Sequence, residues 1–358
     1  MHLTLGILRQ SQAVFYALSF FWLDGFAVPA PAQVSREDHT GRAANRWAAR
    51  NQLYELVFCT GHKMKKYAIK DYQKGFEKNQ ARIGLAVAQN WVWPYAYHLD
   101  GLLRVHSQPD FDPTTRHYCF LDDTMVGYMF SLVMQAEEGT LLTANLDFPR
   151  MMPGHEGAAE LLLDKAFETL QKKGVSRIEG RVTTMCPGDV QLAEKAGFSI
   201  RDWGYKVYYS YEMEWGRLTF PDHLAQEIDP KKDLVECANI ASKWYNRPSD
   251  WCHSHLREWH EEGVITHLGV RKDSELIAAC LAAPNDVRPS TAAIFYIYSP
   301  DEDSLKPMLT KVVNKCVDFG VTNVIADLIN EHRHYEPVYQ IMGFKKVAEW
   351  ARCEKNLS

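Results

Sequence analysis

Three features that mark other classes of protein are missing from this sequence of 358 residues. Its eight cysteines form no C-x-x-C pair, which argues against a cysteine-rich metal site and against a disulfide framework. Lysine and arginine total 40 against 45 aspartates and glutamates, and no segment concentrates the basic residues. Because a nucleic-acid surface needs a concentrated basic patch, we expect no nucleic-acid partner. The scattered, unpaired thiols favour a cytoplasmic location.

The sequence also lacks an apolar run long enough to cross a bilayer. Residues 11–23 are apolar and aromatic, but a transmembrane helix needs about 20 such residues, so we expect no stable membrane association. A small-residue stretch ends at Ala32, which fits the cleavage site of a secretory signal. The early Asp24 and the unpaired cysteines favour another interpretation. In it, residues 1–63 are a dispensable, disordered extension, and the functional chain starts at Met64.

A long-period repeat is the most informative feature that is present. Gly197 follows Gly174 by 23 residues, and 146 residues further along the chain Gly343 follows Gly320 by the same interval. Both second glycines precede a phenylalanine, and each interval holds an apolar run, a polar turn and a short helix-like stretch. Such self-similarity indicates a duplicated domain. The chain length suffices for two domains of roughly 150 residues each.

Both halves show the same order of predicted elements. Apolar residues at helical spacing precede two antiparallel strands, a third strand, a loop, a long amphipathic helix, a strand, a short helix and a closing strand. From the first antiparallel pair onward, these elements are expected at residues 118–133, 141–148, 158–173, 177–182, 190–195 and 198–213 in the first half. In the second half they are expected at residues 264–282, 292–298, 305–319, 323–329, 335–342 and 344–353.

These elements predict an α/β (α+β) fold of two tandem domains. Each domain should contain a mixed, mainly antiparallel sheet flanked by helices. Residues 64–216 form the first predicted domain and residues 233–358 the second. Residues 217–232 contain two prolines and carry no sustained pattern, so we place the linker there.

The order of elements resembles the GNAT acetyltransferase superfamily, as a tandem of two copies that begins at Met64. The family's acyl-CoA motif, Gln/Arg-x-x-Gly-x-Gly/Ala, maps onto residues 154–159, where Gly154 replaces the usual Gln or Arg. Its closing motif maps onto residues 186–198, with Ala193 where a tyrosine is usual. The resemblance implies that the first domain binds acetyl-CoA as acyl donor, without a metal. The residues it implies for this binding are Phe148, Gly154, His155, Glu156, Gly157, Ala158 and Ala159.

The loop at residues 154–159 can also be interpreted without the family. Small residues at a helix N-terminus let a pyrophosphate approach unpaired backbone N–H groups at the positive end of the helix dipole. The equivalent segment of the second half, residues 300–305, carries three carboxylates instead, at Asp301, Glu302 and Asp303. Carboxylates cap a helix well but repel a pyrophosphate. We therefore predict a CoA-binding first copy and a degenerate second copy.

Transfer of an acetyl group to an amine needs a base for the amine proton and an acid near the leaving sulfur. Asp147, near the end of the strand that leads into the loop, is our candidate base, and Glu137 and Glu138 are weaker candidates. Tyr205 is the candidate acid, with Tyr208 and Tyr209 as alternatives on the same strand.

Tyr339 is a third catalytic candidate, because the resemblance places it where the family often has the tyrosine that protonates the thiolate. Its own half has the acidic loop, however, so we expect it to support the fold. Cys186 could act as a thioester nucleophile, but nothing in the sequence pairs it with a base. The histidines around Cys252 match no zinc spacing.

Residues 91–98 form an aromatic run that could wall an amine-bearing acceptor or pack between a helix and the sheet. Two functions fit the sequence. The first is an acetyl-CoA-dependent N-acetyltransferase that uses a ternary complex and acts on a primary amine of a small molecule or peptide. The second is a non-catalytic acyl-CoA-binding or scaffold protein, which the alanine at position 193 favours.

Overall fold

The computed structural model describes residues 66–89, 91–94, 98–134 and 141–357. The predicted extension over residues 1–63 lies outside these residues, as do Glu137 and Glu138. Within the described ranges, no helix is long and apolar enough to cross a membrane. In the same ranges, no group of three or more His, Cys, Asp or Glu side chains could hold a metal ion.

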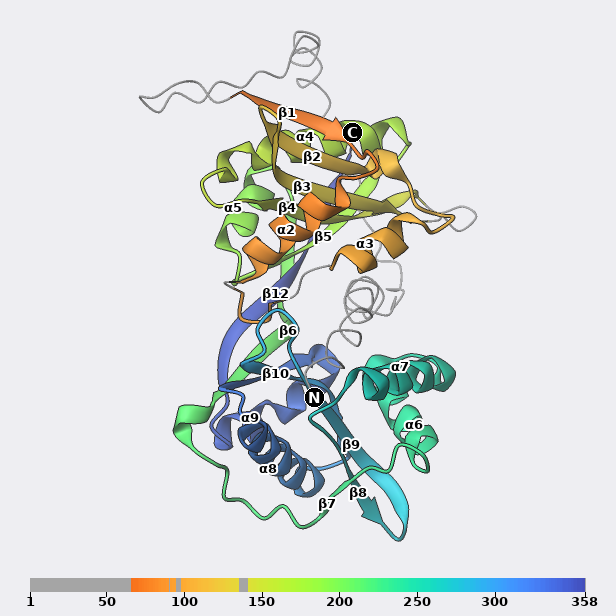
Figure 1. The fold of residues 1–358 in the computed structure, drawn as a ribbon, viewed down its shortest axis with the longest axis vertical. Coiled ribbons are helices and arrows are strands. Elements are labelled where there is room, and N and C mark those ends of the chain that lie inside the picture. The colour runs from red at the N-terminus through yellow and green to blue at the C-terminus, as the bar shows by residue number, and fades with distance from the viewer. Residues whose placement is uncertain (1–65, 90, 95–97, 135–140, 358) are drawn as a thin grey trace, which may run out of the picture.

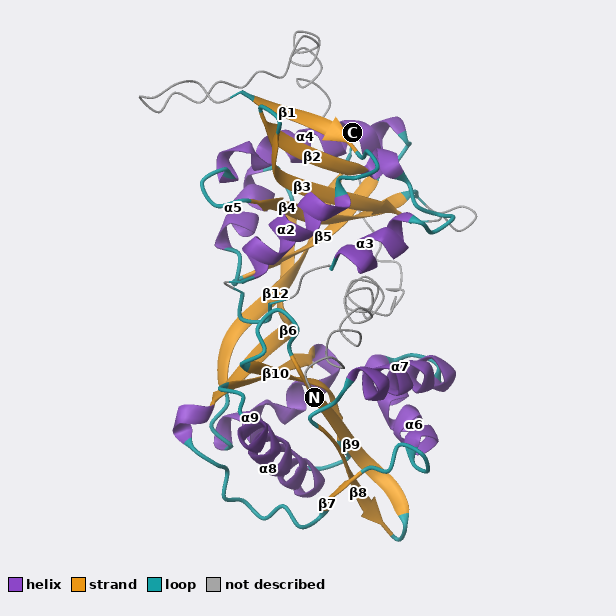
Figure 2. Cartoon of the chain, in the orientation of Figure 1, coloured by secondary structure: helices purple, strands orange, loops and turns teal. Residues whose placement is uncertain are grey.

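The described residues form one mixed sheet of twelve strands, with helices on both of its faces (Figures 1 and 2). The strands are β1 (Tyr67–Asp71), β2 (Arg116–Leu121), β3 (Thr124–Val133), β4 (Thr143–Met151), β5 (Arg177–Thr183), β6 (Ser199–Glu212), β7 (Ala225–Glu227), β8 (Thr266–Lys272), β9 (Glu275–Pro284), β10 (Thr291–Tyr298), β11 (Asn323–Ile329) and β12 (Lys345–Asn356). The helices are α2 (Glu77–Ala88), α3 (Leu99–His106), α4 (Ala159–Lys172), α5 (Pro187–Lys195), α6 (Leu234–Tyr245), α7 (Ser249–Glu262), α8 (Glu302–Phe319) and α9 (Glu336–Ile341). The 3-10 turns are η2 (Pro113–Thr115), η3 (Glu156–Ala158), η4 (Met213–Trp215) and η5 (Asn330–Tyr335).

The sequence repeat is a structural repeat. The first half runs β1, α2, α3, β2, β3, β4, α4, β5, α5 and β6, and the second repeats this order as β7, α6, α7, β8, β9, β10, α8, β11, α9 and β12. The predicted tandem α/β fold is thus confirmed. Two elements were not predicted: α3, and the short strand β7, which lies within the segment we interpret as the linker.

The closing strands of the two halves are exchanged. The strand order is β1-β2-β3-β4-β5-β12-β6-β11-β10-β9-β8-β7, so β12 pairs with β5 of the first half and β6 pairs with β11 of the second. Both strands cross the waist between the halves, where they also pair with each other (Figure 1). Side chains of β6, including Tyr208 and Tyr209, are therefore buried in the core of the second half. Neither half completes its sheet from its own residues.

The strands of the first half bury side chains on both faces, because successive residues of a strand point to opposite sides. Cys119 of β2 packs in a core with α4, whereas its neighbours Tyr118 and Phe120 pack with Ile83 of α2. The first half therefore has three layers, with α2 and α4 on opposite faces of the sheet. The second half is built alike, with α6 and α7 away from α8 (Figure 1).

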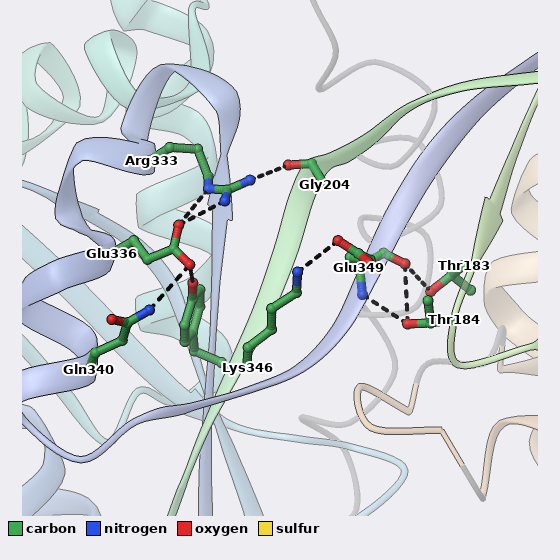
Figure 3. A network of polar contacts seen from close by, with 9 residues as sticks. Thr183, Thr184, Gly204, Arg333, Glu336, Gln340, Lys346 and Glu349 are labelled. Atoms are coloured by element: carbon green, nitrogen blue, oxygen red, sulfur yellow. Dashed lines mark hydrogen bonds and ion pairs between the residues drawn. The ribbon is translucent and has the colours of Figure 1, made fainter.

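A network of polar contacts lies where the exchanged strands β6 and β12 cross between the halves (Figure 3). The Arg333 guanidinium donates to both the Glu336 carboxylate and the Gly204 carbonyl, and Tyr209 of β6 donates to the same Glu336. On the other side of the crossing, the Glu349 backbone of β12 exchanges hydrogen bonds with residues 183 and 184 at the end of β5. The network therefore joins residues of both halves.

Candidate active site

The site begins where two parallel strands of the first half part. The β4–β5 ladder pairs Thr143–Leu146 with Arg177–Gly180 and ends there, although both strands continue. From Asp147 onward, β4 has ladder partners only in β3, and a register shift in the β3–β4 ladder lies at the same place. From this point on, the backbone N–H and C=O groups along one edge of β4 make no ladder hydrogen bonds to β5.

The loop after β4 leads to a helix start that an anion can approach. The N-cap residue of α4 is Ala158, whose side chain cannot accept a hydrogen bond from the first-turn N–H groups. A Cβ placed on either Gly154 or Gly157 would meet no atom within 4 Å, so the space around the loop is open. Gly154 has a φ of +83°, which favours glycine there. The Glu156 carboxylate accepts a hydrogen bond of 3.0 Å from the Gly154 N–H and would have to turn away from a phosphate.

An arginine between two carboxylates lies beside the parted strands. Arg150 Nη2 is 2.9 Å from Asp147 Oδ1, and Arg150 Nη1 is 3.1 Å from Asp189 Oδ2 in the first turn of α5. The guanidinium also lies over the ring of Trp91, 4.7 Å from its centroid. Arg150 and Trp91 are buried, whereas the side chain of Asp147 is 28% exposed and can therefore reach a substrate.

Burial sets the protonation behaviour of this cluster. Desolvation raises the pKa of both carboxyl groups, Asp147 and Asp189, and the attraction of Arg150 opposes that rise. A carboxylate with a raised pKa is a stronger base than an exposed one, which suits it to take a proton from an amine. Burial also raises the pKa of Cys186 to about 12, so this residue is a neutral thiol near pH 7. That argues against Cys186 as a nucleophile.

In the second half, the start of the equivalent helix, α8, is closed to an anion. The N-cap residue of α8 is Asp301, whose carboxylate accepts a hydrogen bond of 2.8 Å from the Ser304 N–H. The Tyr335 hydroxyl accepts a hydrogen bond of 3.0 Å from the Ser299 N–H and donates to the Ser299 carbonyl. This hydroxyl bridges η5 to the residue after β10, so the backbone groups that would face a ligand there are already satisfied.

Aromatic side chains also replace the charged ones in the second half. The β10–β11 ladder ends at Ile294, the equivalent of Leu146, so Phe295 takes the place of Asp147. The Phe295 ring contacts Trp93 of the first half, at a centroid distance of 6.2 Å, and Trp259, at 5.0 Å. No carboxylate stands at that position, which makes the two halves chemically different.

Three solved structures with a similar fold carry the words acetyltransferase or GNAT in their names. A tandem GNAT protein from the clavulanic acid biosynthesis pathway matches 82% of this chain and 99% of its own, with a TM-score of 0.57 at 15% identity. A GCN5-related N-acetyltransferase from Sphaerobacter thermophilus matches 81% of this chain and 96% of its own, with a TM-score of 0.57 at 13% identity. An acetyltransferase of the GNAT family from Colwellia psychrerythraea matches 80% and 99%, with a TM-score of 0.54 at 14% identity.

The chain has the tandem GNAT fold. No protein-family model and no curated protein matches the sequence itself. At these identities the likeness establishes the fold alone.

The tandem GNAT fold brings some predicted site residues together and separates others. Phe148 adjoins Asp147 in β4, and the loop at residues 154–159 leads from that strand into α4. Tyr205 lies on the exchanged strand β6, is buried, and packs in the core of the second half beneath the Arg352 guanidinium. Tyr339 lies in α9 of the second half. The three catalytic candidates are thus spread over both halves.

Tyr339 is fully buried, and its hydroxyl has no hydrogen-bond partner among the described residues. Desolvation raises its pKa well above the ordinary tyrosine value. Its first-half equivalent, Ala193, is also fully buried. Sequence analysis did not single out Arg150 or Asp189. Their only signal was charge in otherwise apolar surroundings, and that signal does not identify a partner.

Proposed function

We propose that the first half of the chain is an acetyl-CoA-dependent N-acetyltransferase that acts on a primary amine in a ternary complex. The observation that carries the proposal is the open, small-residue start of α4 together with a partly exposed, arginine-bound carboxylate, Asp147, on the preceding strand. The closed start of α8 and the aromatic residue at the position of Asp147 support placing the proposed reaction in the first half alone.

The fit to a CoA pyrophosphate rests on the loop. The first-turn N–H groups of α4 and its dipole would hold the anion, and the glycines at 154 and 157 would let it approach the backbone. Acetyl-CoA would supply the thioester from which the acetyl group is transferred. No metal takes part in this proposal.

Asp147 and Asp189 are the carboxylates proposed to serve proton transfer. Asp147 would accept the proton of the amine, and Arg150 would hold that carboxylate in place while Asp189 shares the guanidinium. Arg181 also acts electrostatically on Asp147, so two cations balance the two carboxylates around the site. Tyr205 and Tyr339 stay predictions as acids. Because both are buried in the second half, we propose that water supplies the proton for the sulfur.

The test uses the full chain and measures two quantities. Calorimetry with acetyl-CoA should give one site per chain, and a thiol reagent should detect CoA release with at least one amine from a panel of spermidine, tryptamine, glucosamine and a tripeptide. Gly157→Glu should abolish binding because it puts a charge at the phosphates, whereas the neutral Gly157→Gln should weaken binding less. Asp303→Asn in the second half is the matched control and should leave binding unchanged. Two equivalent sites, or equal binding by both Gly157 variants, would contradict the assignment.

A second candidate function is a non-catalytic acyl-CoA-binding or scaffold protein. It is favoured by Ala193, which leaves the first half without the tyrosine found in the resembled family. This candidate predicts one acetyl-CoA site with the same response to Gly157→Glu, but no CoA release with any amine. The two measurements therefore separate the candidates.

A further inference from the structure

Gln89 and residues 91–94, which follow α2, belong to the first half but are held by the second. Arg288, in the loop between β9 and β10, donates through Nη2 to the Trp91 carbonyl at 3.0 Å and to the Gln89 carbonyl at 2.5 Å. Asn285 of the same loop donates to the Pro94 carbonyl at 2.8 Å. Three backbone carbonyls in one short segment are thus bound by two side chains from almost 200 residues further along the chain, at sequence separations of 199, 197 and 191.

The loop that supplies these donors is itself ordered. The Asn285 side-chain oxygen accepts hydrogen bonds from the N–H groups of Val287, at 3.0 Å, and Arg288, at 2.8 Å. An Asx turn of this kind fixes the direction in which the chain leaves the strand. Arg288 is therefore presented to the segment from a defined backbone conformation.

The held segment carries one tryptophan toward each half. Trp93 inserts into the second half, where it stacks on Tyr208 at a centroid distance of 5.6 Å and contacts Phe295. Trp91 lies under the guanidinium of Arg150, and that guanidinium binds Asp147. A continuous set of contacts therefore runs from Arg288 through Trp91 and Arg150 to the candidate base.

We infer that Arg288 is a positioning residue for the first-half site, and that the degenerate second half serves catalysis by holding Trp91 against Arg150. This inference rests on the proposed function for its catalytic meaning, whereas the placement of Trp91 can be tested without it. Trp91 lies against the guanidinium that joins the two carboxylates, so a shift of this ring changes the orientation of Arg150 and, through it, the place of Asp147 at the acceptor amine. The proposed acetyl-CoA site is the loop before α4, whereas the Arg288 side chain donates to Gln89 and Trp91, so the affinity for acetyl-CoA should not change.

The first measurement needs no substrate. The full chain is labelled with 5-fluorotryptophan, and the fluorine resonance of Trp91 is assigned by its loss in Trp91→Phe. Arg288→Ala should move or broaden this resonance and leave that of the exposed Trp203 in place. Arg288→Lys keeps the charge and should restore part of the shift. The matched control is Arg271→Ala, which removes an arginine of the same half that pairs with Asp233 and Glu236 instead.

The second measurement uses the amine of the panel that the parent protein turns over fastest. Arg288→Ala should raise the KM for that amine roughly tenfold to a hundredfold, as expected when a group of the site is misplaced. It should leave the Kd for acetyl-CoA within about twofold. Arg271→Ala should change neither quantity. If Arg288→Ala does not fold, Arg288→Lys carries the test with a smaller expected change.

The outcomes separate the two proposals. An unmoved Trp91 resonance, or a moved resonance with an unchanged KM, overturns the role of Arg288. A moved resonance in a protein that turns over no amine leaves the placement of Trp91 supported and counts against the proposed enzyme. A change in acetyl-CoA affinity as large as that in KM would mean general distortion and would also overturn the inference.

Discussion

A buried histidine of the second half should make the protein sensitive to acid. His267 of β8 is 2% exposed, and both of its ring nitrogens are engaged. Its Nδ1 lies 2.8 Å from His260 Nε2, and its Nε2 lies 2.6 Å from the Tyr296 hydroxyl. Burial and, to a smaller degree, the neighbouring His260 lower the pKa of His267 from 6.5 to about 3. The folded protein therefore keeps this ring neutral.

The size of the effect follows from proton linkage. At pH 5 an unfolded chain has this histidine almost fully protonated, whereas the folded chain, with a pKa of about 3, has it almost fully neutral. Only the unfolded state binds the extra proton. The contribution of His267 to the free energy of unfolding is therefore fully present above the unfolded pKa of 6.5, and it is lost as the pH falls from there toward 3. Between pH 7.5 and pH 5 the loss from this one group is about 2 kcal/mol.

Urea unfolding of the parent and of His267→Gln at pH 7.5 and pH 5 measures this loss. The variant should be less stable than the parent at pH 7.5, because the Tyr296 and His260 contacts are disturbed. Its loss between the two pH values should nevertheless be smaller than the parent's by about 2 kcal/mol. His223→Gln, at an exposed histidine, is the control and should keep the parent's difference. An equal loss in the parent and in His267→Gln would refute the reasoning.

Other changes test the site and the fold. Asp147→Asn should lower turnover by about 10²–10⁴-fold while acetyl-CoA still binds, because it removes the proposed base and keeps the size of the side chain; unchanged turnover would exclude Asp147 as base. Tyr339→Phe should keep turnover within a few-fold and cost no stability, because its buried hydroxyl has no partner among the described residues; a drop of about a hundredfold with an unchanged melting temperature would move the chemistry to the second half. Calorimetric melting of the full chain should give one cooperative transition, because the exchanged strands make each half depend on the other. Two separate transitions would contradict this coupling.

The duplicated halves show how one fold can keep a site in one copy and close it in the other. The first half retains an open helix start and a carboxylate where the strands part. In the second half an aspartate caps the helix, a tyrosine hydroxyl binds the strand end, and aromatic rings fill the place of the carboxylate. These changes suit packing, since the apolar and hydrogen-bonded groups satisfy one another without a ligand.

Part of the candidate site could be predicted from the sequence. The loop at residues 154–159 and Asp147 were identified because they are close in sequence to a recognisable strand and helix, and they lie in β4 and in the connection from β4 into α4. Arg150 and Asp189 were not identified as a pair, because they are 39 residues apart and meet only after β5 and α5 have folded. The aromatic run around Trp91 suggested a wall of the acceptor site. Nothing in the sequence indicated that Arg150 would be its partner.

The sequence by itself determined the duplication, the order of elements and the chemical difference between the two helix starts. These features depend on local periodicity and on residues adjacent in the chain, so they are already present before the chain folds. Only the tertiary structure decided that β6 and β12 complete each other's half and that Arg288 reaches the segment at Trp91. An apolar closing strand can add to the sheet of either half, since both edges offer the same backbone hydrogen bonds. The choice between them depends on packing between residues more than a hundred positions apart, as where Tyr209 of β6 meets Glu336 and Tyr339 of the second half.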